Sequence, residues 1–225
     1  ADKTSIFGGI VAANREIDLE TAQMLKPIFL EIVMAPSFAP DALELLCTKK
    51  NLRVLKVDMS KDNTVRKQYV SMNGGMLVQD RDINTKPVAA DQCVTELKPT
   101  AEQLADMEFA WKIVKHVKSN AIVVAKGGMT YGVGAGQMNR IGSAELALKQ
   151  AQNTLKEEGK DIMTEGLVLA SDGFFPFNDC VALAAEYGIK AIVQPGGSIR
   201  DEDSIKLANE KGITMLFTGE RHFKH

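Results

Sequence analysis

Short apolar runs alternate with longer segments of helical periodicity along most of the chain. The longest such segment, "PTAEQLADMEFAWKIVKHVKSN", predicts a helix in which Thr100 and Gln103 form a capping box. The apolar runs predict buried strands. These runs are "SIFGGIVA", "IFLEIVMA", "LRVLKVD", "LVLA", "IKAIVQPGG", "TMLFTG" and the pair "AIVVAKGG" and "TYGVGAGQ", which we expect to form a hairpin at Gly127 and Gly128. Strands that alternate with helices predict an α/β fold, a layered α/β sandwich whose sheet is covered by helices.

Further helices are predicted from their first residues. Asp18 is a suitable N-cap for a helix that ends at Leu25, before Pro27. Asp41 and Ser143 are expected to cap helices that reach Lys50 and about Leu155. Two more helices are expected over 180–187 and 201–213, and short strands and loops between 60 and 98.

Composition narrows the class of protein. The 225 residues are 45% hydrophobic and 25% charged, with a formal net charge of -2 and no block of like charges. This composition is typical of a globular protein and argues against a nucleic-acid-binding surface, which would be clustered and basic. No apolar run approaches the roughly 20 residues of a membrane helix, and no leader pattern opens the sequence. We therefore expect a cytoplasmic protein with neither a membrane nor a nucleic acid as partner.

The cysteines indicate no disulfide framework and no zinc site. Cys47, Cys93 and Cys180 are widely spaced and odd in number, as reduced thiols of a cytosolic protein would be. No two cysteines, and no cysteine and histidine, fall at ligand spacing.

Glycine-rich and polar stretches lie where strands are predicted to end. In layered α/β proteins, ligands bind beyond the carboxyl ends of strands, and glycines there allow close backbone approach. For each stretch alone, a tight turn explains the sequence about as well as a ligand site; together they favour a site. The stretches are Phe7-Gly8-Gly9, Ser119-Asn120, "GAGQMNR", "SDGFFPFND" and "QPGGS".

Phe174, Phe175 and Phe177 are unusual residues for the turn between a strand and a helix. One or two of them can pin the helix entry as a hydrophobic staple. A further aromatic face is available to stack on a flat heterocycle, which contributes on the order of 1 kcal/mol. Asp172, in the same apolar turn, requires a partner such as a backbone N–H, a cation or a ligand.

These motifs together resemble one enzyme family. "FGGIVA", "IFLEIVMAPSF", "KSNAIVVAK", "GVGAGQMNR", "LASDGFFPFND", "PGGSIRDED" and "GITMLFTGERHFKH" follow the order and spacing of the transformylase part of the PurH family of bifunctional purine biosynthesis proteins. The family carries 5-aminoimidazole-4-carboxamide ribonucleotide (AICAR) formyltransferase and inosine monophosphate (IMP) cyclohydrolase activities. The resemblance implies a cytidine-deaminase-like fold without zinc, repeated within the transformylase part, and a homodimer. It implies that 1–98 are the rear of a first unit, truncated at its N-terminus, and that 99–225 are a complete second unit.

The resemblance also implies roles for individual residues. On the substrate side, Phe174 would stack on the aminoimidazole, Arg221 would bind the phosphate, and Phe7, Gly8 and Glu31 would contact the ribonucleotide. Asn120 and His225 would serve the catalytic centre. The co-substrate would be 10-formyltetrahydrofolate, with folate-binding positions at Asn139, Arg140, Ile141, Pro176, Asp179 and Ser198. Some members bind potassium, for which Asp172 is a candidate neighbour; Phe175 and Phe177 are assigned to packing.

Two other classes of function stay open. A non-catalytic module that binds a nucleotide or folate would share the loops without the chemistry, and a gene that continues upstream into a Lys-His motif would argue against it. An α/β interaction domain with incidental loops would give no heat with AICAR or a folate in calorimetry.

The sequence departs from the family in one respect that bears on activity. In the family an adjacent Lys-His pair upstream of the "FGG" strand supplies the base and the oxyanion contact. Lys115-His116 and Lys224-His225 stand elsewhere in the sequence. We expect this 225-residue chain to be a C-terminal fragment with little or no formyl transfer by itself, and near-normal turnover of the purified chain would contradict that.

Overall fold

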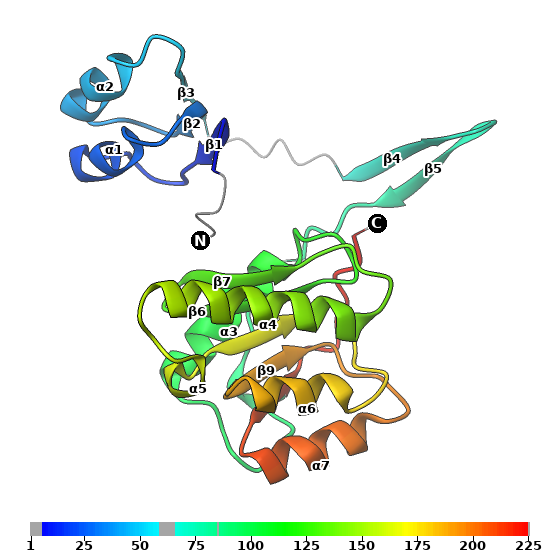
Figure 1. Cartoon of the computed structure of the whole chain (residues 1–225). Helices are drawn as coiled ribbons and strands as arrows, with labels where there is room; N and C mark the ends of the chain where they lie inside the picture. The colour runs from blue at the N-terminus through cyan, green and yellow to red at the C-terminus, as the bar shows by residue number, and fades with distance from the viewer. Residues whose placement is uncertain (1–5, 59–65, 85, 225) are drawn as a thin grey trace. The chain divides into compact units, whose positions relative to one another are not determined.

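The computed structural model describes residues 6–58, 66–84 and 86–224, which divide into two compact units (Figure 1). The division lies between Arg81 and Asp82. The described residues of 82–98 therefore belong to the carboxyl-terminal unit. The division into two transformylase units at residue 98 stays a prediction. Among the described residues, no helix is long and apolar enough to cross a membrane.

The amino-terminal unit contains a small parallel sheet in the order β1-β2-β3. Its apolar core lies between the sheet and two helices and includes Ala22, Val33 and Leu46. A separate antiparallel hairpin follows. The elements are β1 (Gly9–Ala12), α1 (Leu19–Leu25), β2 (Leu30–Ala35), α2 (Pro40–Cys47), β3 (Arg53–Lys56), β4 (Lys67–Met72) and β5 (Gly75–Asp80).

The carboxyl-terminal unit is a five-stranded sheet covered by helices on both faces. In chain order its elements are the 3₁₀ helix η1 (Ala90–Gln92), α3 (Ala101–Val114), β6 (Ile122–Lys126), β7 (Met129–Gly134), α4 (Arg140–Glu157), α5 (Ile162–Glu165), β8 (Val168–Ser171), α6 (Asp179–Glu186), β9 (Ala191–Gln194), α7 (Asp201–Lys211) and β10 (Thr214–Phe217).

Two apolar layers hold this sheet between its helices. Met107, Trp111 and Val114 of α3 pack on one face. Leu148 of α4 and Val181 of α6 pack on the other face, where α4, α6 and α7 lie together (Figure 1). Strand β8 is buried along its whole length, as an apolar run between two neighbouring strands requires. The expected α/β fold is confirmed in this layered form.

The strand order is β10-β9-β8-β6-β7, and β6 is the one member that runs against the others. The carboxyl ends of β7, β8, β9 and β10 therefore lie at the same edge of the sheet as the amino end of β6. We call this edge the functional edge. Figure 1 shows the chain's carboxyl-terminal tail, drawn in red, leaving β10.

Local capping signals predicted some helices correctly and others wrongly. Thr100 and Gln103 form the expected capping box of α3, and Asp18 caps α1. Ser143 is not an N-cap, because α4 begins at Arg140 with the side chain of Asn139 accepting from the Gly142 N–H at 2.8 Å. Asp41 lies inside the first turn of α2, which begins at Pro40 and ends at Cys47 rather than at Lys50.

Glycines in β7 allow α4 to lie directly on the strand's backbone. A Cβ at Gly132 would be 1.8 Å from the carbonyl oxygen of Ala147, and one at Gly134 would be 1.9 Å from that of Ser143. Neither glycine has the left-handed backbone that would itself require glycine, so close approach alone accounts for both. This contact fixes the first turn of α4 against the functional edge.

We predict that Gly132→Ala destabilises the carboxyl-terminal unit by about 1–3 kcal/mol or more, because the new methyl group displaces the α4 backbone. Denaturant unfolding followed by fluorescence measures this directly, since the chain's single tryptophan lies in that unit. Gly75→Ala is the control, because a Cβ there meets nothing within 4 Å. Equal stability of the two variants would contradict the packing argument.

Candidate functional site

Five segments of the carboxyl-terminal unit meet at the functional edge. They are 118–121 before β6, 135–139 after β7, 172–178 after β8, 195–200 after β9 and 218–224 after β10. Four of them contain stretches singled out from the sequence, namely Ser119-Asn120, "GAGQMNR", "SDGFFPFND" and "QPGGS". The expected position beyond the carboxyl end of a strand is confirmed for "GAGQMNR", "SDGFFPFND" and "QPGGS". It is wrong for Ser119-Asn120, which enters β6 at its amino end and reaches the same edge because β6 is reversed.

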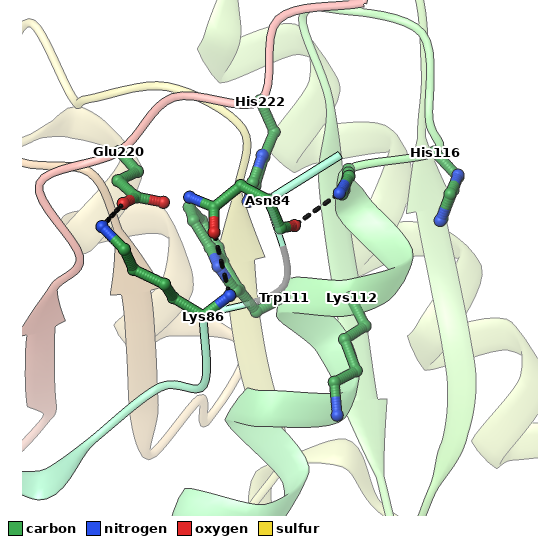
Figure 2. Close-up of a pocket in the computed structure, with 8 residues that line it drawn as sticks. Asn84, Lys86, Trp111, Lys112, His116, Glu220 and His222 are labelled. Atoms are coloured by element: carbon green, nitrogen blue, oxygen red, sulfur yellow. Dashed lines mark hydrogen bonds and ion pairs between the residues drawn. The ribbon is translucent and has the colours of Figure 1, made fainter. Parts of the chain in front are cut away.

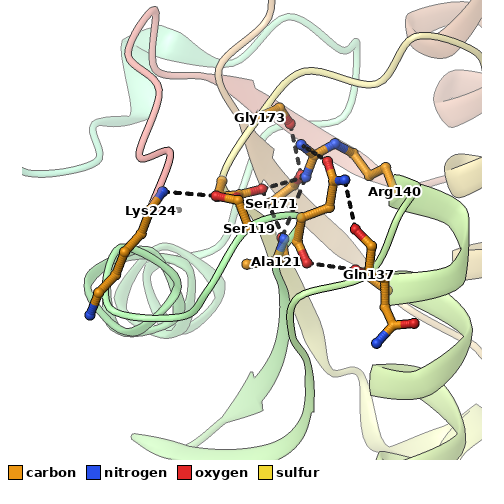
Figure 3. A network of polar contacts seen from close by, with 10 residues as sticks. Ser119, Ala121, Gln137, Arg140, Ser171, Gly173 and Lys224 are labelled. Carbon is orange, nitrogen blue, oxygen red and sulfur yellow. Dashed lines mark hydrogen bonds and ion pairs between the residues drawn. The ribbon is translucent and has the colours of Figure 1, made fainter. Parts of the chain in front are cut away.

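Asp172 lies at the centre of this edge and is fully buried. Its carboxylate accepts hydrogen bonds from the Ser119 hydroxyl at 2.5 Å and from the Ala121 N–H at 3.1 Å. Nη1 of Arg140 donates to the same carboxylate at 2.5 Å (Figure 3). Two of the partners expected for this acid are therefore present, a backbone N–H and a cation, and the Ser119 hydroxyl is a third partner.

Arg140 connects several segments through its guanidinium. Besides Asp172, Nη1 donates to the Ser171 hydroxyl at 2.8 Å and Nη2 donates to Oδ1 of Asn120 at 3.0 Å. The side chain is 6% exposed, so its charge is neutralised inside the protein rather than in solvent. Gly173 leaves room for it, because a Cβ there would be 2.4 Å from Nη2.

The side-chain amide and the backbone carbonyl of Asn120 are both hydrogen-bonded. Its Nδ2 donates to the carbonyl of Gln137 at 2.9 Å, and its own carbonyl accepts from the hydroxyl of Ser143 at 2.7 Å. The Ser143 hydroxyl therefore contacts the site instead of capping a helix. Asn120 lies half-buried at the functional edge.

The aromatic loop after β8 places its rings in different surroundings. Phe175 is fully buried in the core, which confirms packing as its role. Phe174 is half-buried, and the guanidinium of Arg221 lies 4.8 Å from its ring centroid. Phe177 is 50% exposed, and the guanidinium of Arg200 lies 5.0 Å from its ring centroid, so it packs on a cation rather than in the apolar core.

The carboxyl-terminal tail is attached to the strand ends by backbone hydrogen bonds. The His222 N–H donates to the carbonyl of Asp172 at 3.0 Å, and the Ser119 N–H donates to that of Lys224 at 2.8 Å. The Lys224 N–H in turn donates to the Ser119 hydroxyl at 2.9 Å. These bonds hold the tail so that Arg221 lies beside Phe174. From the sequence alone, a solvated terminal segment is an equally good interpretation of this tail. His225 lies outside the described residues.

The residues assigned to folate lie around this centre. Asn139 caps α4, Ile141 is half-buried in its first turn, and Pro176 and Asp179 are exposed at the start of α6. Ser198 lies in the loop after β9, where its hydroxyl accepts from the Arg200 N–H at 3.2 Å. Arg140 is the exception, since its guanidinium is buried in the Asp172 cluster. Their binding roles stay predictions.

Phe7, Gly8 and Glu31 form a group of their own in the amino-terminal unit. A Cβ on Gly8 would lie 3.6 Å from Cγ of Glu31, whose Oε2 accepts from Arg53 at 2.8 Å. Phe7 is exposed and contacts Phe29, with ring centroids 4.6 Å apart. The expectation that Phe7-Gly8-Gly9 lies beyond the carboxyl end of a strand is wrong, because β1 begins at Gly9 and these residues enter it.

Ser119 and Ser171 lie in stretches that the sequence singled out, but sequence reasoning assigned neither of them a role. Ser119 and Ser171 bind Asp172 and Arg140 directly, yet small hydroxyl residues beside strands carry no distinctive pattern. The one available signal was the buried acid, which required several donors nearby.

Two features bear on the chemistry available here. Burial raises the pKa of the Cys180 thiol to about 12, with the charge of Asp179 adding to the effect, so this thiol stays protonated at neutral pH. Within the described ranges, no group of three or more His, Cys, Asp or Glu side chains could hold a metal ion. Donors of the chain itself already contact both oxygens of Asp172.

The family model and the similar sequences indicate the same protein family. The family model "AICARFT/IMPCHase bienzyme" matches residues 1–150. The bifunctional purine biosynthesis protein PurH of Anoxybacillus flavithermus is 58% identical over 225 residues, and that of Bacillus subtilis is 55% identical. Each match covers 100% of this chain and 42% of the relative. The chain thus spans less than half the length of these curated relatives.

Solved structures give much weaker similarity. A diaminohydroxyphosphoribosylaminopyrimidine deaminase/5-amino-6-(5-phosphoribosylamino)uracil reductase from Thermotoga maritima matches 50% of this chain and 34% of its own, with 21% identity and a TM-score of 0.31. A score this low carries no argument, so the cytidine-deaminase-like fold stays a prediction.

We predict that Asp172→Asn destabilises the carboxyl-terminal unit by about 3–5 kcal/mol, because it leaves the buried charge of Arg140 without its counter-ion. Denaturant unfolding followed by tryptophan fluorescence measures the change. Asp91→Asn, at an exposed position in η1, is the control and should shift stability by no more than about 0.5 kcal/mol. An Asp172→Asn variant as stable as this control would show that the cluster does not hold the edge together.

Proposed function

Because this chain belongs to the AICARFT/IMPCHase bienzyme family, we propose that it forms the part of the transformylase that binds AICAR and 10-formyltetrahydrofolate. In that reaction a formyl group passes from the folate to the amine of AICAR during IMP synthesis. A role in purine biosynthesis follows from the family. The assignment to the carboxyl-terminal transformylase region is our proposal, and the contact between Phe174 and Arg221 is the observation that carries it.

That contact joins two recognition elements suited to a nucleotide. The half-buried ring of Phe174 offers an aromatic face on which a flat aminoimidazole can stack. The guanidinium of Arg221, 4.8 Å from that ring, is exposed and matches a phosphate in shape and charge. A ribose separates the base from the phosphate in AICAR, so both ends of the ligand find partners within one side-chain length of each other.

Positioning accounts for much of what these residues contribute. The amine of AICAR is a poor nucleophile, because its lone pair is drawn into the ring and the carboxamide. Its attack on the formyl carbon therefore requires a base for the amine proton, donors for the oxyanion and two substrates in register. Asn120, with its amide fixed by Arg140 and Gln137, is suited to orient the amine side of this encounter.

The folate is proposed to bind along the starts of α4 and α6. Asn139, Ile141, Pro176, Asp179 and Ser198 flank the cluster there, and the exposed carboxylate of Asp179 is a fitting acceptor for the amino and ring N–H groups of a pterin. Arg140 contributes by holding Asn120 and Asp172 rather than through a free guanidinium.

Broader properties of the family extend this proposal. We expect a zinc-free cytidine-deaminase-like fold, a homodimer in the full-length enzyme and a cytoplasmic location. Phe7, Gly8 and Glu31 are proposed to contact the ribonucleotide, and His225 to lie near the catalytic centre. The sheet order β10-β9-β8-β6-β7 with β6 reversed supports the fold assignment.

We predict that AICAR binds this 225-residue chain and that Phe174→Ala weakens binding about tenfold through lost stacking. Arg221→Ala should weaken it at least as much, because a charged hydrogen-bonded contact to phosphate is lost. Isothermal titration calorimetry measures both affinities. Phe177→Ala is the matched control, an exposed phenylalanine of the same loop that should leave AICAR affinity unchanged. No heat with the unaltered chain, or equal effects of Phe174→Ala and Phe177→Ala, would contradict the proposal.

A further inference from the structure

The tail after β10 presents its side chains alternately to two sides. Arg221 and Phe223 face the aromatic loop: the guanidinium of Arg221 lies near the Phe174 ring, and Phe223 lies close against Gly173. Glu220 and His222 instead line a separate cavity of about 260 Å³ beside α3 (Figure 2). The residue proposed to bind phosphate is therefore flanked by two neighbours that are fixed elsewhere.

His222 is the stronger of these two attachments. It is 3% exposed, and its ring packs on that of Trp111 with centroids 4.4 Å apart. Its Nδ1 contacts the carboxylate of Asp82, and its backbone N–H donates to the Asp172 carbonyl. A tilted ring contact, a polar contact and a backbone hydrogen bond together restrict both the ring and the main chain at this position.

Asp82 is itself held in place. Its Oδ1 accepts from the Asn84 N–H at 3.2 Å and lies 3.5 Å from Nζ of Lys115, which also donates to the carbonyl of Asn84 at 2.5 Å. Burial acts to raise the pKa of Asp82, but His222, Lys115 and the Asn84 N–H outweigh it and hold the pKa below its ordinary value. The carboxylate is therefore ionised at neutral pH and available to His222.

Glu220 provides a weaker attachment on the other side of Arg221. Its carboxylate pairs with Lys86 at 2.6 Å, although the lysine side chain is 77% exposed. Exposed pairs of this kind contribute little to stability. Arg221 itself is exposed, and its guanidinium lies over the rings of Phe174 and Phe223. The backbone that carries Arg221 is therefore held most firmly by the buried neighbour that follows it.

We propose that His222 is a positioning residue: clamped between Trp111 and Asp82, it fixes Arg221 beside Phe174 for recognition of the substrate's 5′-phosphate. The inference rests on the function proposed above and adds a specificity determinant to it. A residue that acts only through Arg221 affects a ligand with a phosphate and leaves the same nucleoside without a phosphate unaffected.

The test compares AICAR with its dephosphorylated nucleoside on the full 225-residue chain. We expect His222→Ala to lower AICAR affinity about tenfold and to leave nucleoside affinity unchanged. Adding His222→Ala to Arg221→Ala should cause no further loss of AICAR affinity, because both changes remove the same interaction. His222→Asn, whose amide N–H can replace Nδ1 at Asp82, should retain more AICAR affinity than His222→Ala.

Two further variants keep the outcome clear. His116→Ala alters another histidine that lines the same cavity and should leave both affinities unchanged. Asp82→Ala removes the partner from a position that is one-third exposed, so it tests the clamp even where His222→Ala fails to fold. Asp82→Ala should reproduce the selective loss of AICAR affinity.

Equal losses for AICAR and the nucleoside, additive losses in the double variant, or no loss with Asp82→Ala would each overturn the inference. One further result would contradict the proposed function rather than this inference. Full AICAR affinity in Arg221→Ala would show that this arginine does not bind the phosphate, whatever His222 does.

Discussion

The buried ion pair between Arg140 and Asp172 is the contact on which the functional edge depends. Arg140 is the first residue of α4, and Asp172 directly follows β8, so the pair joins a helix to a strand end. Removing two charges from water costs several kcal/mol per ion, and hydrogen bonds from Ser119 and Ala121 offset part of that cost. A buried pair of this kind is a weak source of stability, but it strictly limits the relative positions of the segments that carry it.

The aromatic loop after β8 shows how one short segment serves both the core and the surface. Phe175 is fully buried and anchors the loop, whereas Phe174 stays half-buried next to Arg221. Phe177, half exposed, contacts Arg200 from the next loop along the sheet. Because one phenylalanine supplies the packing, the others are free to present faces to cations or to a flat ligand. This division explains why the turn tolerates so many aromatic residues.

Sequence reasoning succeeded where the determinants are local. The capping box of Thr100 and Gln103 and the Gly127-Gly128 turn depend on neighbouring residues alone, and both formed as predicted. Ser143 has the side chain of an N-cap, yet its hydroxyl bonds the carbonyl of Asn120, which is distant in sequence. Arg140 is likewise assigned to the folate from the sequence, and only the folded chain brings Asp172 to its guanidinium.

The same limit applies to the remaining site residues. The order of motifs identified the family and the strand ends, because order and spacing are properties of the sequence itself. The side of the tail on which Arg221 lies depends on the partners of His222, and two of them, Asp82 and Trp111, come from much earlier in the chain. Contacts of such separation carry no short-range pattern from which they could be inferred.

The reversed direction of β6 places Asn120 at one end of this sheet and the turn from β6 to β7 at the other. Because β6 runs against its neighbours, Asn120 enters the sheet where the other strands leave it, and the tight turn from β6 to β7 falls at the far end. A Cβ at Gly127 or Gly128 in that turn would meet no atom within 4 Å. An inserted residue therefore has space in that turn, whereas an insertion at the functional edge would displace the segments joined by Arg140 and Asp172.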